Sequence, residues 1–385
     1  MNIVYYMIFI IILVVIVLLA GNILKKNNLN LFITVMCSII IIALILNPEN
    51  CINSSLQGTK LFVYKVFPTM FPFVILTNII IDYGGMHIYA KAFGKTLCRI
   101  LRLPHNSSIV IVISILCGYP LGAKYCSDLY EKKGIDFNTA TRLLNIATNC
   151  SPLFIVGTIG SSMLHSKLYG YILLTSGYMS CLIMSILLPS EKVAKKELTL
   201  NNSNYTNNNF GETLKACVEN SIYSCVMVAG FIIIFSVLLG QIKNTLVFSA
   251  LNQNKIIGTI ILGMVEMTNG CSLVNLSKID ILPKLILFSF FTSFGGLCVM
   301  SQVYAFTYKF KFNMFKYLCR KLLQGIISAF STFALYILCS NYSIVTISHK
   351  YLVVTQSNSD LLILLIVLFV FPFILQKIKE LIKSF

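Results

Sequence analysis

The first half of the chain contains the stretch Cys117-Gly118-Tyr119-Pro120-Leu121-Gly122-Ala123-Lys124, which decides how the sequence around it must fold. It continues an apolar run, yet it carries two glycines and a proline, residues that interrupt helices and leave backbone groups unpaired. Within a bilayer, irregular backbone is tolerated only where protein buries it or where it lines a water-filled cavity. An interrupted, lysine-bearing segment at membrane depth is therefore a candidate solute site.

Composition indicates a polytopic membrane protein. Of the 385 residues, 57% are hydrophobic and only 11% are charged, and the mean hydropathy is +0.84. The net charge of +17 is dispersed between apolar runs, which fits the positive-inside rule and not a basic face that binds nucleic acid. The thirteen cysteines contain no C-x-x-C pair, so we expect reduced thiols, no disulfide framework and no metal.

The pattern of hydropathy predicts an all-α fold with about nine transmembrane helices and two re-entrant helical hairpins. The full-length apolar runs lie near residues 3–24, 29–46, 61–82, 143–165, 168–189, 216–240, 285–308, 322–340 and 359–376. Two shorter runs, 108–124 and 256–274, are interrupted by Gly, Pro or polar residues. We expect each of these two to enter and leave the membrane on the same side.

The distribution of basic residues supports this topology. With the N-terminus outside, the C-terminus cytoplasmic and both hairpins re-entrant, the cytoplasmic segments hold 22 of the 30 Lys and Arg residues, including Lys124 and Lys321. Treating the hairpins as spans would move the basic segments 125–142 and 190–215 outside, against the positive-inside rule. Residues 87–103 are predicted to form an amphipathic helix on the cytoplasmic surface.

The two halves of the chain repeat one order of elements. Gly263 lies 145 residues after Gly118, and a second interrupted span at Ser293 lies 144 residues after the one at Asn149. Because the halves run in opposite directions under the predicted topology, we expect an inverted repeat with a site where the broken elements meet. Chance symmetry is the alternative, since glycine is common in membrane helices. The predicted division is N-terminal transmembrane helices (1–58), a first repeat (59–189), a polar cytoplasmic linker (190–215), a second, inverted repeat (216–340) and a C-terminal transmembrane helix with a basic tail (341–385).

The candidate site combines glycines, hydroxyls, amides and two charges from both halves. Its members are Gly118, Tyr119, Gly122, Lys124, Asn149, Ser151, Glu266, Thr268, Asn269, Ser293, Gly295, Gly296 and Gln302. Glycines let the backbone approach a ligand closely, and broken helix ends offer unpaired N–H groups to an anion. Lys124 would pair with an anionic group or would snorkel to the cytoplasmic interface. Glu266 would couple transport to H⁺ or Na⁺, or would pair with Lys124.

Helix packing, without any solute, is the alternative explanation for several of these residues. Pro152 would kink a helix whose Asn149 bonds to a neighbour. Ser293, Gly295 and Gly296 would allow close helix packing. The sequence alone does not decide between solute binding and helix packing for these residues.

Four motifs carry a resemblance to a known family. They are Gly118–Lys124 (GYPLGAK), Asn149–Phe154 with Gly157, Gly263 with Glu266–Thr268 and Gly270, and Ser293–Leu297 with Gln302. Together, over about residues 60–340, they resemble the YlbJ family of sporulation integral membrane proteins, within the wider group of nucleoside-recognition gate domains whose fold is akin to concentrative nucleoside transporters. One departure is Met300-Ser301-Gln302, where that family often has a histidine, so Gln302 is the candidate there.

The resemblance implies a stage V sporulation transporter that moves dipicolinic acid (pyridine-2,6-dicarboxylate) from the mother cell across the outer forespore membrane. It implies gate-like repeats, a small anionic solute and the lipid bilayer as partners, and no cofactor other than a coupling ion. A homo-oligomer is left open, because concentrative nucleoside transporters form trimers. A transporter of a nucleoside or another small polar solute and a non-transporting membrane protein of spore assembly stay as alternatives. We do not expect an enzyme, because the four histidines lie in or beside loops and no G-x-S-x-G motif occurs.

Overall fold

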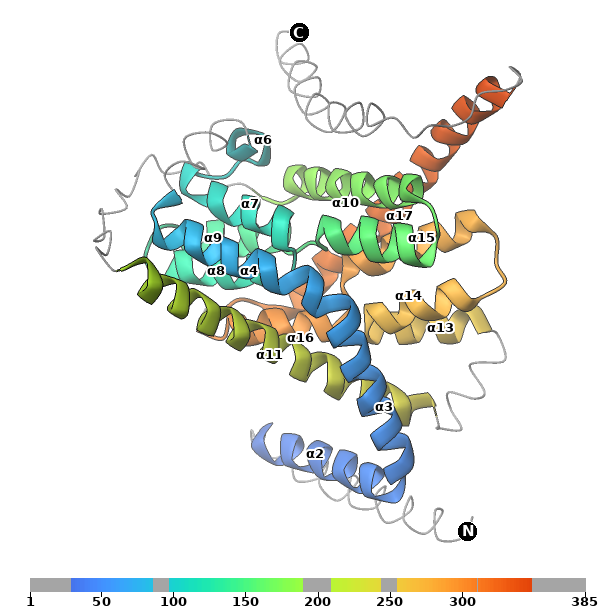
Figure 1. Cartoon of the computed structure of the whole chain (residues 1–385), viewed down its shortest axis with the longest axis horizontal. Helices are drawn as coiled ribbons and strands as arrows, with labels where there is room; N and C mark the ends of the chain where they lie inside the picture. The colour runs from blue at the N-terminus through green and yellow to red at the C-terminus, as the bar shows by residue number, and fades with distance from the viewer. Residues whose placement is uncertain (1–28, 86–96, 190–208, 244–254, 310, 348–385) are drawn as a thin grey trace.

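A computed structural model describes residues 29–85, 97–189, 209–243, 255–309 and 311–347 of the chain. Within these segments every regular element is a helix (Figure 1). A helix pairs its backbone groups within one segment, which is what a lipid environment demands.

The helices before residue 190 are α2 (Leu29–Leu46), α3 (Pro48–Leu61), η1 (Phe62–Val66), α4 (Phe67–Asp82), α6 (Arg99–Leu101), η3 (His105–Ser107), α7 (Ser108–Cys117), α8 (Leu121–Glu131), α9 (Phe137–Ile146), η4 (Leu153–Met163) and α10 (Lys167–Leu187). Those after residue 208 are α11 (Phe210–Lys243), α13 (Lys255–Val265), α14 (Met267–Leu276), α15 (Ile281–Phe294), α16 (Gly296–Phe306) and α17 (Met314–Ile347). Both η1 and η4 are π-helical, and η3 is a 3₁₀ turn.

Five stretches of the described segments are long and apolar enough to cross a membrane. They are Pro48–Asp82, Lys167–Leu187, Phe210–Lys243, Ile281–Phe306 and Met314–Cys339. The expected class, an all-α membrane protein, is confirmed. The spans predicted at 3–24 and 359–376, and most of the surface helix predicted at 87–103, fall outside the described residues, so the total of nine spans stays a prediction.

The helix that contains the predicted span 61–82 begins much earlier, at Pro48. A proline in the first turn and Glu49 beside it both favour a helix start. The polar residues that follow pack against α11, where small side chains let the two backbones approach. A Cβ on Gly58 would lie only 2.9 Å from the side chain of Ser236. Close packing therefore holds a segment that hydropathy alone assigns to a loop.

Two later helices also begin before their predicted starts. The first, α11, begins at Phe210, inside the segment 190–215 that was predicted to be a linker. The second, α17, begins at Met314 and not near residue 322. Lys321 consequently lies two turns inside α17 and is 2% exposed. Its placement in a loop was wrong, because the helix extends past the apolar run that marked its start, and the side of the membrane on which it lies stays a prediction.

Each interrupted short segment folds back on itself as a helical hairpin. In the first, α7 and α8 pack together and are joined through Gly118–Pro120, with a cis bond between Tyr119 and Pro120. In the second, α13 and α14 run side by side (Figure 1) and join at Glu266. A Cβ on Gly270 would lie 2.3 Å from the Cα of Gly263, so the second pair of helices is in backbone contact. That the hairpins re-enter the membrane stays a prediction.

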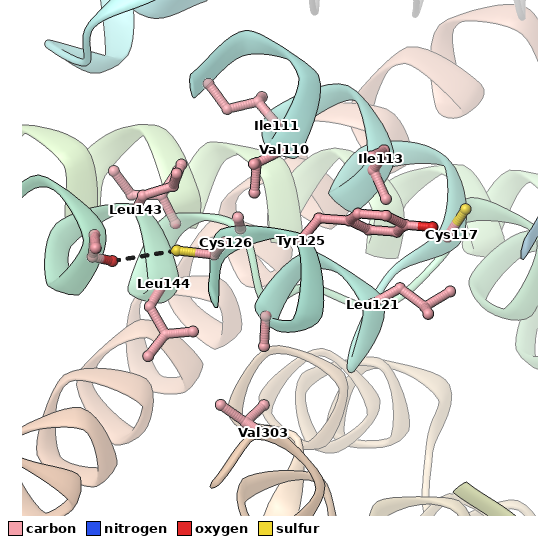
Figure 2. Close-up of a cluster of buried hydrophobic side chains, with 14 of the residues drawn as sticks. Val110, Ile111, Ile113, Cys117, Leu121, Tyr125, Cys126, Leu143, Leu144 and Val303 are labelled. Atoms are coloured by element: carbon pink, nitrogen blue, oxygen red, sulfur yellow. Dashed lines mark hydrogen bonds between the residues drawn. The ribbon is translucent and has the colours of Figure 1, made fainter. Parts of the chain in front are cut away.

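A buried core connects the first hairpin with α9 and α16. Figure 2 shows the Tyr125 ring of α8 extending toward Cys117 at the end of α7. The Cys126 thiol donates a hydrogen bond to the carbonyl of Ala140 in α9 at 3.4 Å. Val303 of α16 packs on the same cluster from the other side of α8 (Figure 2). The core thus fixes the hairpin against elements of both halves.

Arg142 ties α9 to the ends of two other helices. Its guanidinium donates to the carbonyls of Ser185 and Leu188 at 2.5 Å, of Leu101 at 2.8 Å and of Pro189 at 3.1 Å. Carbonyls at helix ends have no partner within their own helix, and a cation is favoured beside them. A buried arginine therefore satisfies the C-terminal ends of α6 and α10 together.

Candidate functional site

The tip of the first hairpin lies directly against the break between α9 and η4. The Tyr119 N–H donates to the carbonyl of Asn149 at 2.7 Å. Gly118 has φ +75°, and a Cβ there would lie 2.5 Å from the backbone nitrogen of Ser151. A Cβ on Gly122 would collide with the backbone of the same break. Only glycine allows this approach, which explains why the motif is rich in it.

The second hairpin meets the break between α15 and α16 in the same way. Gly295 and Gly296 have φ values of +83° and +77°, a conformation that favours glycine. A Cβ on Gly296 would lie 3.1 Å from the carbonyl oxygen of Met264 and 3.2 Å from that of Val265. Each half therefore contains a hairpin tip packed on the broken helix that follows it. That inverted symmetry relates the two halves stays a prediction.

Tyr119 joins the two junctions. Its hydroxyl lies 2.8 Å from Sδ of Met267, at the start of α14, and 3.5 Å from the carbonyl of Thr292 in α15. One buried cluster also combines residues of the first break and η4 with residues of α14 and α15, among them Cys150, Phe154, Cys271 and Phe291. The broken elements of both halves thus meet around Tyr119, and that this junction is a solute site stays a prediction.

Glu266 serves as the N-cap of α14. The side chain is 2% exposed, and its carboxylate accepts hydrogen bonds from the Thr268 N–H at 3.0 Å, the Thr268 hydroxyl at 2.6 Å and the Asn269 N–H at 2.7 Å. An N-cap acceptor satisfies backbone donors that a helix start leaves unpaired. Glu266 and Lys124 are both described, and no ion pair joins them. The proposed ion pair between them is thus absent.

Lys124 forms its hydrogen bond with α11 and not with a hairpin tip. Its ammonium donates to the Ser224 hydroxyl at 3.2 Å, and Asp128 follows one turn later on α8. Gln302 is buried in α16, where its amide contacts the Cys298 sulfur at 3.4 Å. Ser293 is buried at the end of α15. Of the predicted site residues, the structure therefore gathers those at the tips and breaks, and directs Lys124 elsewhere.

Local capping accounts for the polar side chains of the first break. The Asn149 amide donates to the carbonyl of Ile146 at 2.6 Å, and its oxygen accepts from the Cys181 thiol at 2.9 Å. The Ser151 hydroxyl accepts from the Phe154 N–H at 3.3 Å, at the start of η4. These contacts hold the ends of the broken helix in place.

A buried polar stripe on α17 contributes residues that the sequence reasoning missed. Its members are Tyr317, Lys321, Gln324, Ser328 and Thr332, each at most 2% exposed. Steps of three or four residues place them on one helix face. That spacing in the sequence indicates a polar helix face. Hydropathy averaged over a window does not detect it, because the apolar residues between the polar ones dominate the average.

The N-terminal part of the stripe binds the first break. The Lys321 ammonium donates to the carbonyl of Thr148 at 2.5 Å and to Oε1 of Gln324 at 2.8 Å. The Tyr317 hydroxyl donates to the Thr148 hydroxyl at 2.9 Å, and the Gln324 amide donates to Oδ1 of Asn149 at 3.0 Å. Among the described residues, no carboxylate lies within 4.0 Å of Lys321. A cation that pairs with no described carboxylate is therefore buried beside the candidate site.

The C-terminal part of the stripe forms hydrogen bonds with α10 and α15. The Ser289 hydroxyl of α15 lies 2.6 Å from that of Ser328 and 3.2 Å from that of Ser176 in α10. The Thr332 hydroxyl donates to Ser176 at 2.8 Å. Hydrogen bonds of this kind between membrane helices contribute about 0.6 kcal/mol each on average. They fix α17 against α10 and α15.

The chemistry of the site suits a small polar or anionic solute. It offers hydroxyls, amides, backbone groups at broken helices and one buried cation, the combination that forms solute and ion sites in transporters. In the segments that the structure describes, no group of three or more His, Cys, Asp or Glu side chains could hold a metal ion.

Comparison with curated proteins finds a relative that aligns with most of the chain. The chain is 26% identical over 313 residues to the sporulation integral membrane protein YlbJ of Bacillus subtilis (strain 168). The alignment covers 74% of this chain and 77% of that protein. No family model matches the chain, and no solved structure matches it.

Proposed function

The chain belongs to the family of the sporulation integral membrane protein YlbJ, and from this premise we propose that it is a transporter that carries dipicolinic acid. The solute would move from the mother cell across the outer forespore membrane, into which this chain would be inserted with its N-terminus outside and its C-terminus in the cytoplasm. The proposed activity is transport and not catalysis, with the lipid bilayer and the solute as partners and without nucleic acid.

The observation that carries this proposal is the junction of two hairpin tips and two broken helices around Tyr119, with Lys321 buried next to it. Dipicolinate is a planar dianion at neutral pH, so a site for it needs a positive charge and hydrogen-bond donors. The described carboxylate at the junction, Glu266, is already bonded to the N–H and hydroxyl groups of its own hairpin. The Lys321 ammonium and the N–H groups at the broken helix ends therefore offer partners to an anion, while the oxygens of Glu266 are occupied within their own hairpin.

A nucleoside or another neutral solute is the second candidate. Neutral groups such as those of Asn149, Ser151 and Thr268 would suit it. A buried lysine would be a needless cost in a site for a neutral solute, since charges inside a membrane protein are expensive. The buried ammonium of Lys321 therefore supports dipicolinate over the neutral solute.

Uptake by the purified full-length protein in liposomes tests the proposal. We expect uptake of dipicolinate that excess unlabelled dipicolinate abolishes and excess uridine does not. Competition by uridine would favour a nucleoside transporter. The absence of any uptake would favour a non-transporting role in spore assembly. In a spore-forming host, deletion of the gene should leave dipicolinate in the mother cell and deplete it in the spore.

The proposed orientation is tested separately. Lys132 is exposed at the end of α8, in a segment predicted to be cytoplasmic. A Lys132→Cys variant, in a background whose native cysteines do not react, should be protected from an impermeant thiol reagent added outside the cell. Labelling of intact cells would contradict the re-entrant hairpin model.

A further inference from the structure

Lys321 holds a positive charge among oxygen ligands, and no carboxylate of the described segments pairs with it. It is 2% exposed, and both of its hydrogen-bond partners, the Thr148 carbonyl and the Gln324 amide oxygen, are neutral. A neutral donor such as a glutamine amide could make hydrogen bonds of the same kind. Burying an ammonium costs far more than burying an amide, particularly within a membrane. Structural bonding alone therefore does not account for the charge.

The carbonyl that Lys321 contacts lies at the negative end of a half-helix. Helix α9 ends at Ile146, and Thr148 follows in the break. The last carbonyls of a helix lack partners within it and give its C-terminal end a partial negative charge. In transporters with broken helices, such half-helix ends and unwound carbonyls coordinate the coupling cation. The ammonium therefore occupies the kind of position where a coupling ion binds.

Gln324 extends the effect of the charge to the site itself. Lysine can only donate hydrogen bonds, so Oε1 of Gln324 faces Lys321 and the amide nitrogen is left to donate. That nitrogen lies 3.0 Å from Oδ1 of Asn149 and 3.0 Å from the Cys181 sulfur. The ammonium thereby sets the orientation of Gln324, and Gln324 in turn positions Asn149 next to the hairpin tip.

From this geometry we infer that the Lys321 ammonium is a tethered cation that replaces a coupling Na⁺ ion at the α9 break, and that transport consequently does not require Na⁺. The transport side of the inference rests on the proposed function. The cation requirement of the break does not, because it can be measured on the folded protein without any solute.

Thermal unfolding of the purified full-length protein tests the cation requirement. The wild type should unfold at the same midpoint in Na⁺, K⁺ and N-methylglucamine chloride at equal ionic strength. Lys321→Ala leaves the oxygens without their cation, so its midpoint should fall, and methylammonium or Na⁺ should restore part of the loss. Lys316→Ala, an exposed position on the same helix, is the matched control and should respond to no cation.

Two results of that experiment would overturn the inference. One is a wild-type midpoint that rises with Na⁺ specifically, which would reveal a separate site for the ion. The other is a Lys321→Ala midpoint that no small cation raises. If Lys321→Ala does not fold, Lys321→Gln takes its place, because an amide retains donors for the same oxygens. It should fold and lose stability without a response to bulky N-methylglucamine.

Transport measurements give an independent result. Uptake of dipicolinate by the wild type should proceed at the same rate in Na⁺ and in K⁺. Lys321→Gln should lose about tenfold or more, the factor expected when hydrogen bonds to a charged group are replaced by neutral ones. Na⁺-dependent uptake by the wild type would overturn the tethered cation and leave the proposed function intact. A wild type that takes up no dipicolinate in any salt would overturn the proposed function, while the unfolding experiment would still decide the inference.

Discussion

Replacing Gly122 by alanine should force the first hairpin away from the break that it contacts. A Cβ at this position would lie 1.8 Å from the carbonyl oxygen of Ala147 and 3.1 Å from the Cβ of Ser114. An ordinary contact begins at 3.4 Å, so α8 and the break would have to separate by about 1.6 Å, the difference between 3.4 and 1.8 Å. The obstacle is a backbone carbonyl, which cannot turn away as a side chain can.

The size of the effect follows from two opposed contributions. Overpacking a tight site costs about 1–3 kcal/mol, and a rigid backbone neighbour favours the upper end of that range. Alanine is also a better helix former than glycine, which returns about 1 kcal/mol. We therefore expect Gly122→Ala to lower the free energy of unfolding by about 2 kcal/mol. At about 2.1 cal/mol/K per residue over 385 residues, this corresponds to a fall of about 2.5 °C in the unfolding midpoint.

The assay is thermal unfolding of the solubilised full-length protein, with Gly230→Ala as the matched control. Gly230 lies within α11, and a Cβ there would meet nothing within 4 Å, so this control should be as stable as the wild type or more stable. Gly122→Ala should also lose solute uptake, because the separation would break the bond between Tyr119 and Asn149. Equal midpoints for the two alanine variants would refute the close contact between the hairpin and the break.

Three further substitutions test other parts of the structure by the same unfolding assay. Arg142→Met should lower the free energy of unfolding by about 3 kcal/mol or more, because it removes the donor from several carbonyls at helix ends. Arg320→Met, at a partly exposed position, is the control and should change it little. Equal losses for the two variants would contradict the capping role of Arg142. Glu266→Gln should cost about 1 kcal/mol as a weakened N-cap and leave the pH dependence of uptake unchanged, and a shifted pH profile would reassign the residue to coupling. A double-mutant cycle of Ser289→Ala and Ser328→Ala should give a coupling energy of about 0.6 kcal/mol, and additivity would show that this hydrogen bond does not stabilise the bundle.

Sequence reasoning located the hairpin tips and the breaks because their chemistry is local. A glycine that interrupts an apolar run indicates a positive φ or a close contact with a neighbouring backbone, and both inferences need only the residue type and the adjacent sequence. Gly118 and Gly296 illustrate this, since both were selected from sequence: Gly118 lies at a hairpin tip against the backbone of a break, and Gly296 lies in a break against the backbone of a hairpin tip. The repeated order of elements predicted that the broken elements meet, whereas their meeting around Tyr119 is seen only in the structure.

The same reasoning missed what depends on partners far away in sequence. The polar start of α3 and the early start of α17 look like loops, because hydropathy does not register a polar residue that another helix satisfies. Lys321 was assigned to a cytoplasmic segment for that reason. Its ligand, the carbonyl of Thr148, lies 173 residues away and belongs to a break whose free carbonyl cannot be located without the fold.

The buried stripe of α17 shows why one of its members needs more than a structural explanation. Tyr317, Gln324, Ser328 and Thr332 each bond to a group on another element, which fixes the register of α17 against α10, α15 and the first break. A slide of one helical turn would separate all of these pairs and leave polar groups unpaired in an apolar bundle. Neutral side chains suffice for that purpose. Lys321 adds a full charge to a register that its neighbours already determine, and the carbonyl at the negative end of α9 accepts a hydrogen bond from that charge, as Oε1 of Gln324 does.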